Sequence, residues 1–434
     1  MSGNRPASWK WWVCGLLLCA SAINYMDRQT LANASVRITR EFHLSQEQYG
    51  NFELAFGWAF AAGSLLFGWL ADRVPVRWLY PVVLALWSAV GIATGRVHSY
   101  GGMLACRAML GLFEAGHWPC GVKTTQRLLE RKDRTMGNGV LQSGTSIGAV
   151  ITPLLMNWLM TEQPGSWRFV FQAIGMTGMA WILFWLVLVP RGELGVVRAR
   201  GMGGSRTPTP GEGTRPSSEP GAAPASESFW KVVFSRRFLL ILFIITLINT
   251  MFQLLRAWLP KFLIEGRGYA ESAALNFNAL FYVATDIGCL GAGVVTLWLH
   301  RRKFSVHRAR TTVFFCCATL TALTTVAAAL PRGWPLLVVL TMVGAGGLGL
   351  FPTYHALTQE LSPSHQGKIT GIAGIVAWSI GSPAQKYFGR WVDQTHSFDG
   401  GMALVGWLPL VAFLGLWLFW KPAAGDEAGM ATTP

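Results

Sequence analysis

Asp27 and Arg28 are adjacent ionisable residues in the first apolar stretch of the chain. A guanidinium binds carboxylates through paired hydrogen bonds, and a buried carboxyl group can carry a proton. The uncharged residues 11–26 would rise only about 24 Å as a helix, less than the ~30 Å core of a bilayer. Residues 29–36 are also uncharged and would extend the same helix. We therefore expect both charges inside a spanning helix; the alternative is that they end it at the membrane surface.

Arg107 and Glu114 form a second candidate pair. They are seven residues apart, which places them on one helical face about two turns from each other. A lone charge in the middle of a bilayer costs at least ~2.5 to 3.5 kcal/mol, so charges found there usually mark a path for ions or substrate. A purely structural ion pair is the alternative.

Further ionisable residues lie in or near other apolar runs. Asp286 lies midway along an apolar run without a partner close in sequence, and both a functional and a structural role remain open. Arg256 and Lys261 lie near the end of another apolar run. They either attract anions into the protein or extend to the membrane surface, which is the commoner behaviour of such side chains.

The composition places these residues in a membrane protein. Of the 434 residues, 52% are hydrophobic and 13% are charged, against roughly 25% charged in soluble domains. The net charge of +15 would otherwise suggest nucleic-acid binding, but that function needs the basic residues on a solvated face. Nucleic acid is therefore excluded as the main partner, and the bilayer is the expected surrounding.

Apolar runs long enough to span a bilayer occur twelve times, which predicts an all-α membrane protein with two six-helix halves around a central cavity. The halves are expected at 1–190 and 236–421, joined by a disordered cytoplasmic linker at 191–235 that is rich in Gly, Pro and Ser, with a cytoplasmic tail at 422–434. The expected spans are 11–35, 50–71, 78–97, 101–124, 138–160, 168–189, 238–260, 274–299, 311–330, 334–358, 369–388 and 402–420.

Lys and Arg are concentrated in the loops on the side of the two termini, for example at Arg301, Arg302 and Lys303. The positive-inside rule therefore predicts that both termini are cytoplasmic. Lys10 and the following apolar stretch imitate a signal peptide, but its removal would leave eleven spans, so we expect a retained first helix.

Enzymatic activity is not expected. The G-x-S-x-G pattern at 144–148 lies within an apolar helix, whereas a nucleophile elbow needs a strand before it. The sequence contains no H-E-x-x-H pattern, and we predict no metal site and no cofactor other than protons as the coupling ion.

Residues 68–77, GWLADRVPVR, resemble the G-x-L-A-D-R-x-G-x-R signature of the major facilitator superfamily, with Pro75 in place of the usual glycine. In that superfamily the signature locks the cytoplasmic side of the transporter through charge and helix-dipole contacts. The resemblance implies a gating role for Gly68, Asp72, Arg73 and Arg77.

Within that superfamily, the chain is similar to the anion:cation symporters. The similarity lies in Asn24–Arg28 (NYMDR) and in Arg107–Gly116 (RAMLGLFEAG). The stretches Trp118–Pro119, Ser143–Ala149 and Trp258–Pro260 are similar to the bacterial hexuronate transporters, whereas His117 departs from the expected asparagine.

The family implies a role for most of these residues. Arg28 matches the residue that binds the substrate carboxylate, and Tyr25, Arg107 and Trp378 match further substrate-binding positions. Asp27 and Glu114 match the acids that couple transport to protons. Further residues that could line the cavity are Asn24, His117, Asn249, Asp286 and His355.

The resemblance thus predicts a proton-coupled symporter, functional as a monomer in a bacterial inner membrane, that imports a sugar-acid anion. A hexuronate such as galacturonate or glucuronate is the expected substrate. The alternatives are a symporter or antiporter of another small organic acid, such as an aldonate, an aldarate or an aromatic acid, and a sensor that binds without transport. Arg28 would serve all of these acids equally.

Overall fold

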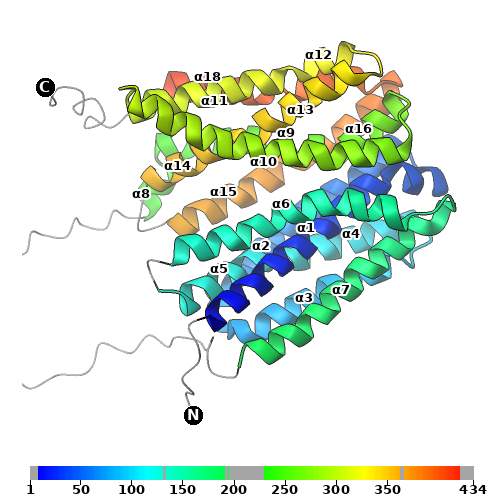
Figure 1. Ribbon diagram of the computed structural model, residues 1–434, viewed down its shortest axis with the longest axis horizontal. Helices are drawn as coiled ribbons and strands as arrows, with labels where there is room; N and C mark the ends of the chain where they lie inside the picture. The colour runs from blue at the N-terminus through cyan, green and yellow to red at the C-terminus, as the bar shows by residue number, and fades with distance from the viewer. Residues whose placement is uncertain (1–7, 131–132, 191–193, 195–228, 362–365, 421–434) are drawn as a thin grey trace, which may run out of the picture.

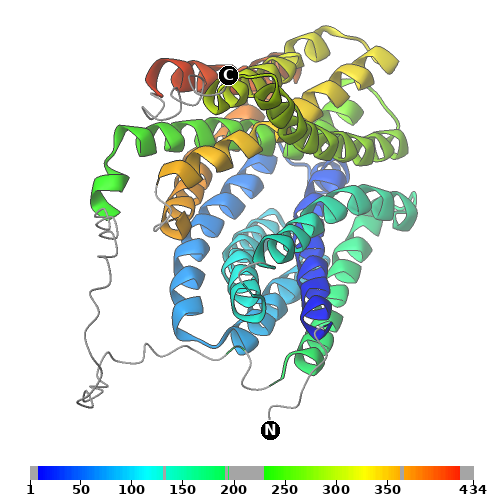
Figure 2. The same cartoon turned by 60° about the vertical axis from the view of Figure 1, so that its left-hand side comes forward.

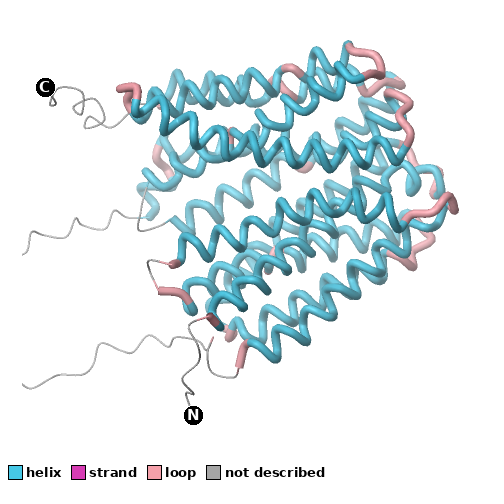
Figure 3. Tube along the Cα trace, viewed as in Figure 1, coloured by secondary structure: helices cyan, strands magenta, loops and turns pink. Residues whose placement is uncertain are grey.

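The computed structural model describes residues 8–130, 133–190, 194, 229–361 and 366–420, and the regular elements in this part of the chain are all helices (Figures 1 and 3). The first half contains α1 (Trp9–Glu41), α2 (Gln46–Arg73), α3 (Val76–Thr94), α4 (Tyr100–Glu114), α5 (His117–Leu128), α6 (Arg134–Leu159), the 3₁₀ turn η1 (Pro164–Ser166) and α7 (Trp167–Leu188).

The second half begins with α8 (Phe229–Val233), α9 (Arg236–Lys261), the π-helical turn η2 (Phe262–Gly266) and α10 (Glu271–Arg301). It continues with α11 (Val306–Ala322), α12 (Thr324–Ala329), α13 (Trp334–Gly349), α14 (Phe351–Leu361), α15 (Gln366–Gly381), α16 (Pro383–Thr395), α17 (Asp399–Val405) and α18 (Leu408–Phe419).

These helices form two bundles that lie side by side, the first half below and the second above in Figures 1 and 2. Within the described residues, nine helical segments are long and apolar enough to cross a membrane. Three more passages complete the predicted twelve: α1, which contains charges, and the broken passages α4–α5 and α15–α16. The predicted all-α fold is confirmed.

Four of the passages in the second half are broken by a short irregularity, and the break between α15 and α16 positions two polar side chains. Pro383 has no backbone N–H to donate, so α16 begins there. The Ser382 hydroxyl donates a hydrogen bond to the carbonyl oxygen of Trp378 at 2.5 Å. This contact orients the Ser382 side chain, and both residues lie beside the interface between the halves.

Polar contacts join the two halves at one end of the bundle, on the right in Figure 1. We call it the far end, because α1 and α9 both begin at the opposite end. Arg37 at the end of α1 pairs with Glu271 at the start of α10 at 2.7 Å. Glu47 on α2 pairs with Arg390 on α16 at 2.8 Å, and Asp393 accepts hydrogen bonds from the first backbone N–H groups of α2. These contacts hold the two halves together at the far end.

The structure describes only part of the predicted linker and tail. The last part of the predicted linker, residues 229–233, forms the short helix α8. Most of that linker, and the predicted tail at 422–434, lie outside the described residues.

Helices α1 and α6 are in close contact because α6 carries glycines at the crossing. A Cβ atom added to Gly148 would lie 2.4 Å from the carbonyl oxygen of Ala22, and one added to Gly144 would lie 2.2 Å from that of Leu18. Small residues allow helix backbones to approach in this way. The crossing fixes α1, which carries Asp27 and Arg28.

We expect Gly148→Ala to destabilise the protein by about 1–3 kcal/mol, because the added methyl group must displace backbone. Gly139→Ala on the same helix is the control, since its Cβ would meet nothing within 4 Å. The measurement is the melting temperature of the purified protein in detergent. Equal melting temperatures for the two variants would contradict the close contact.

Candidate functional site

An ion pair between Arg28 and Glu114 lies at the centre of the first half. Arg28 Nε donates to Glu114 Oε2 at 2.6 Å, and the two side chains are 7% and 0% exposed. α1 supplies the arginine and α4 supplies the glutamate at its last residue. A buried ion pair is costly to break by removing one partner, so any other anion that approaches Arg28 competes with Glu114.

Aromatic rings surround the Arg28 guanidinium. Its central carbon lies 4.6 Å from the ring centroid of Phe60, 5.1 Å from that of Phe56 and 5.8 Å from that of Trp378. Phe56 and Phe60 come from α2 of the first half, whereas Trp378 comes from α15 of the second. The negative faces of these rings stabilise the guanidinium cation. Rings accept no strong hydrogen bonds, so the N–H groups of Arg28 still need an anionic or polar acceptor.

Asp27 points away from this pair. It is 1% exposed, and neither carboxyl oxygen has a hydrogen-bond partner among the described residues. A Cβ atom added to Gly91 on α3 would lie 3.3 Å from Asp27 Oδ1, so the side chain faces α3. Adjacent residues on α1 thus serve different neighbours, as the helical geometry predicted.

Arg107 does not form the ion pair with Glu114 that their shared helical face suggested. Its nearest carboxylate is Glu53 on α2, with Nη2 and Oε1 3.6 Å apart. Arg107 is fully buried, and its guanidinium nitrogens make no hydrogen bond within the described part of the chain. Arg28 on α1 takes the place of Arg107 as the partner of Glu114.

Glu53 joins the two halves and was missed by the sequence analysis. Its Oε2 accepts a hydrogen bond from the Arg256 guanidinium of α9, and both side chains are 1% exposed. Arg256 Nε also donates to Gln253 Oε1 at 2.6 Å. An acid within an apolar run was the available signal, but Glu53 lies near the start of its predicted span and resembles a surface charge.

Arg256 and Lys261 do not extend to the membrane surface, so that expectation was wrong. Lys261 is fully buried and donates to Thr39 Oγ1 on α1 at 2.9 Å. Both residues face the other half, which supplies the hydrogen-bond acceptors that water would supply at the surface.

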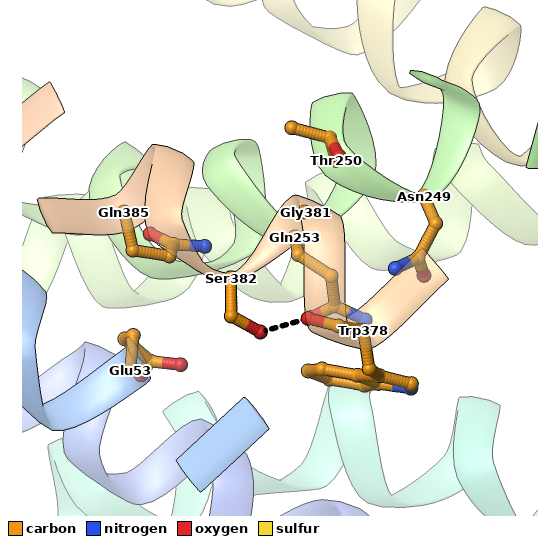
Figure 4. Close-up of a pocket in the computed structure, with 8 residues that line it drawn as sticks. All are labelled: Glu53, Asn249, Thr250, Gln253, Trp378, Gly381, Ser382 and Gln385. Atoms are coloured by element: carbon orange, nitrogen blue, oxygen red, sulfur yellow. Dashed lines mark hydrogen bonds between the residues drawn. The ribbon is translucent and has the colours of Figure 1, made fainter. Parts of the chain in front are cut away.

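A small cavity lies between the halves beside these charges (Figure 4). Glu53 and Trp378 line it together with polar side chains of the second half: Asn249, Thr250, Gln253, Ser382 and Gln385. It offers about 10 Å³ to the centre of a water molecule, which is room for roughly one water. Asp27, Arg28 and Glu114 do not line this cavity, but Trp378, which lines it, also contacts the Arg28 guanidinium.

The other candidates occupy different surroundings. Tyr25 faces the second half, where its ring meets that of Tyr282 edge-on with centroids 6.5 Å apart. Asn24 is buried on α1, and its amide nitrogen has no partner among the residues described. Asn249 lines the cavity, whereas His355 packs against Tyr354 on α14.

Asp286 and His117 have hydrogen-bond partners that the sequence did not reveal. Asp286 Oδ1 accepts a hydrogen bond from Ser146 Oγ of the other half at 2.7 Å. His117 is fully buried inside the first half, with Nε2 3.0 Å from Ser21 Oγ and Nδ1 2.9 Å from the Tyr80 hydroxyl. Its partners come from α1 and α3, and it does not line the cavity.

The residues of the 68–77 signature lie at the end of the bundle where α1 begins. Asp72 pairs with Lys123 of α5 in the same half, and Arg73 stacks on Trp69 with its guanidinium carbon 4.1 Å from the ring centroid. Arg77 donates to the carbonyl oxygen of Val189, just after α7. The space around Gly68 is open. These contacts organise the first half.

The family model described as the Major Facilitator Superfamily matches residues 17–385. The D-galactonate transporter of Escherichia coli O6:H1 is 25% identical over 96% of this chain and 98% of its own length. The galacturonate transporter of Dickeya chrysanthemi is 23% identical over 69% of this chain and 84% of its own length. The hexuronate transporter of Escherichia coli K12 is 24% identical, over 69% and 67% respectively.

Solved structures share the fold. A bacterial homologue of the human lysosomal transporter Spinster, in an inward-facing and unoccupied conformation, matches with a TM-score of 0.75 at 16% identity over 97% of this chain and 100% of its own. A D-xylose–proton symporter matches with a TM-score of 0.72 at 13% identity over 96% and 99%. At these identities the likeness concerns the fold.

We expect His117→Ala to lower the melting temperature of the protein, because it leaves the buried hydroxyls of Ser21 and Tyr80 without this partner. The expected loss is about 1–3 kcal/mol for each hydroxyl left unsatisfied. His98→Ala is the control, since His98 is exposed. An unchanged melting temperature for His117→Ala would show that these hydrogen bonds contribute nothing.

Proposed function

This chain belongs to the major facilitator superfamily, whose members are transporters and not enzymes, and we propose that it is a proton-coupled symporter that imports a sugar-acid anion by alternating access. A hexuronate such as galacturonate or glucuronate is the proposed substrate. The names of the relatives, which are transporters of D-galactonate, galacturonate and hexuronate, support an acidic sugar derivative.

The observation that carries this proposal is the buried pair of Arg28 and Glu114 at 2.6 Å. Arg28 has an anionic partner only while Glu114 is ionised. When a proton neutralises Glu114, the guanidinium is left without its counter-charge in the membrane interior, and a substrate carboxylate can take that place through paired hydrogen bonds. Proton binding and substrate binding then favour each other, as symport requires.

Asp27 supplies a second site for a proton. Its carboxyl oxygens lack hydrogen-bond donors among the described residues, and an ionised carboxylate in such surroundings is costly until a proton neutralises it. A monoanion that moves with one proton carries no net charge, whereas two protons make the step electrogenic. Each net charge that crosses 100 mV contributes about 2.3 kcal/mol. We propose that transport carries positive charge inward.

The second half supplies groups suited to the hydroxyls of a sugar. Asn249, Gln253 and Gln385 offer amides, each of which both donates and accepts hydrogen bonds, and Trp378 offers a ring face to the apolar side of a sugar. The cavity holds roughly one water in this closed arrangement, so substrate must enter after the halves move apart.

The same proposal includes the orientation. The basic loops lie on the side of the two termini, and we assign that side to the cytoplasm and the far end to the outside of a bacterial inner membrane. The contacts at the far end then correspond to a transporter closed towards the outside.

We expect Arg28→Ala to weaken galacturonate binding by about 2–5 kcal/mol, because the substrate carboxylate loses its guanidinium. Binding is measured by the rise in melting temperature that galacturonate produces in the purified protein. Arg310→Ala is the control, because Arg310 pairs with Glu360 far from the cavity. Unchanged affinity in Arg28→Ala would refute the carboxylate assignment.

We expect Glu114→Gln to abolish accumulation of galacturonate driven by a pH gradient in reconstituted vesicles, while exchange of labelled for unlabelled substrate continues. The amide keeps the shape of the side chain but cannot release a proton. Glu360→Gln is the control. Accumulation at the wild-type level by Glu114→Gln would remove this residue from proton coupling, and the absence of exchange in the wild type would contradict transport itself.

A further inference from the structure

Three guanidinium groups and three carboxyl groups lie buried in the middle of the protein. The cations are Arg28, Arg107 and Arg256, and the acids are Asp27, Glu53 and Glu114. Glu114 is the ion-pair partner of Arg28, and Asp27 has no ion pair among the described residues. Glu53 therefore serves two arginines at once.

Arg107 and Arg256 come from opposite halves and converge on this one carboxylate. Arg256 donates to Glu53 Oε2, whereas Arg107 Nη2 lies 3.6 Å from Glu53 Oε1, beyond hydrogen-bonding distance. The guanidinium nitrogens of Arg107 and the Oε1 atom of Glu53 make no hydrogen bond in the described part of the chain. A fully buried guanidinium without a hydrogen bond is a donor that lacks its acceptor.

This group is next to the space that a ligand would enter. Glu53, Gln253 and Trp378 all line the cavity (Figure 4). Gln253 accepts a hydrogen bond from Arg256 Nε, and Trp378 contacts the Arg28 guanidinium. Arg28 and Arg107 both contact the aromatic ring of Phe56, with their guanidinium carbons 5.1 and 4.7 Å from its centroid. The two cationic positions thus flank one aromatic side chain.

We propose that Arg107 and Arg256 form a second anion site, that Glu53 fills it as an internal counter-anion, and that Glu53 thereby restricts the substrate to one carboxylate. With Glu53 ionised, a second carboxylate of a ligand would meet like charge and no unoccupied guanidinium pair. Without the charge of Glu53, Arg107 and Arg256 have no counter-anion. A dicarboxylate sugar acid can then bind Arg28 through one carboxylate and the second anion site through the other. This inference rests on the proposed function, whose substrate carboxylate binds Arg28.

The test compares a monocarboxylate, galacturonate, with a dicarboxylate, galactarate, by calorimetric titration of purified wild type and Glu53→Gln. We expect the wild type to prefer galacturonate, and Glu53→Gln to shift the ratio of the two dissociation constants towards galactarate by at least tenfold. Adding Arg256→Gln to Glu53→Gln should reverse the shift, because the second site then loses one of its cations.

Glu47→Gln is the matched control. Glu47 is on the same helix and also forms ion pairs across the halves, with Arg390 and Lys386, but it lies outside the cavity. The ratio of the galacturonate and galactarate dissociation constants in Glu47→Gln should equal that of the wild type. A Glu53→Gln protein that binds both acids more weakly by the same factor would overturn the inference, since a purely structural role predicts that result.

Two further outcomes keep the test decisive. If Glu53→Gln is too unstable for calorimetry, galactarate should raise its melting temperature more than galacturonate does, and equal increases would overturn the inference. If the wild type binds neither acid, the proposed function fails, whereas wild-type binding of galacturonate with an unshifted ratio in Glu53→Gln overturns the second anion site alone.

Discussion

A charge in the membrane interior needs a partner, and this requirement governs the centre of the protein. The side chains of Arg28, Arg107 and Arg256 are at most 7% exposed, so water does little to stabilise them. Their stability depends on the carboxylates of Glu114 and Glu53. Adding a proton to either acid, or an anion to the group, changes which partners remain. In the proposed function, binding, protonation and the arrangement of the halves are therefore linked by electrostatics.

The two halves contribute different chemistry to this centre. The first half supplies Arg28, Glu114 and Asp27, whereas the second supplies amides, hydroxyls and Arg256. Residues 125–126 (TQ) and 146–148 (SIG) match residues 358–359 and 379–381 at an offset of 233 residues. At that offset Arg107 and Glu114 correspond to Leu340 and Gly347. Most of the buried charges at this centre thus come from the first half, and the amides and hydroxyls beside them come from the second. A ligand that contacts both sides stabilises the arrangement in which they are close.

The sequence predicted the helices and the position of Arg28 and Glu114 inside them, because hydrophobic length and the cost of a membrane charge are local properties. It did not predict their pairing. A shared helical face suggested Arg107 as the partner of Glu114, but in the structure α1 packs against α5, which begins three residues after Glu114, and this packing brings Arg28 to Glu114. Glu53 and Arg256 looked like surface charges near the ends of spans. Their burial depends on the contact between α2 and the second half, which no local pattern encodes.

The contacts between the halves differ in what they can control. Pairs at the far end such as Arg37 with Glu271 are partly exposed, and exposed pairs contribute about 0–1 kcal/mol each. The pair of Glu53 and Arg256 is buried, and breaking such a pair costs about 3–5 kcal/mol. A ligand moves a conformational equilibrium only by its difference in affinity between the two states. The largest difference in affinity is available where the ligand replaces or neutralises a buried partner. The centre of the interface, more than its solvated rim, is therefore where binding can shift the equilibrium between arrangements of the halves.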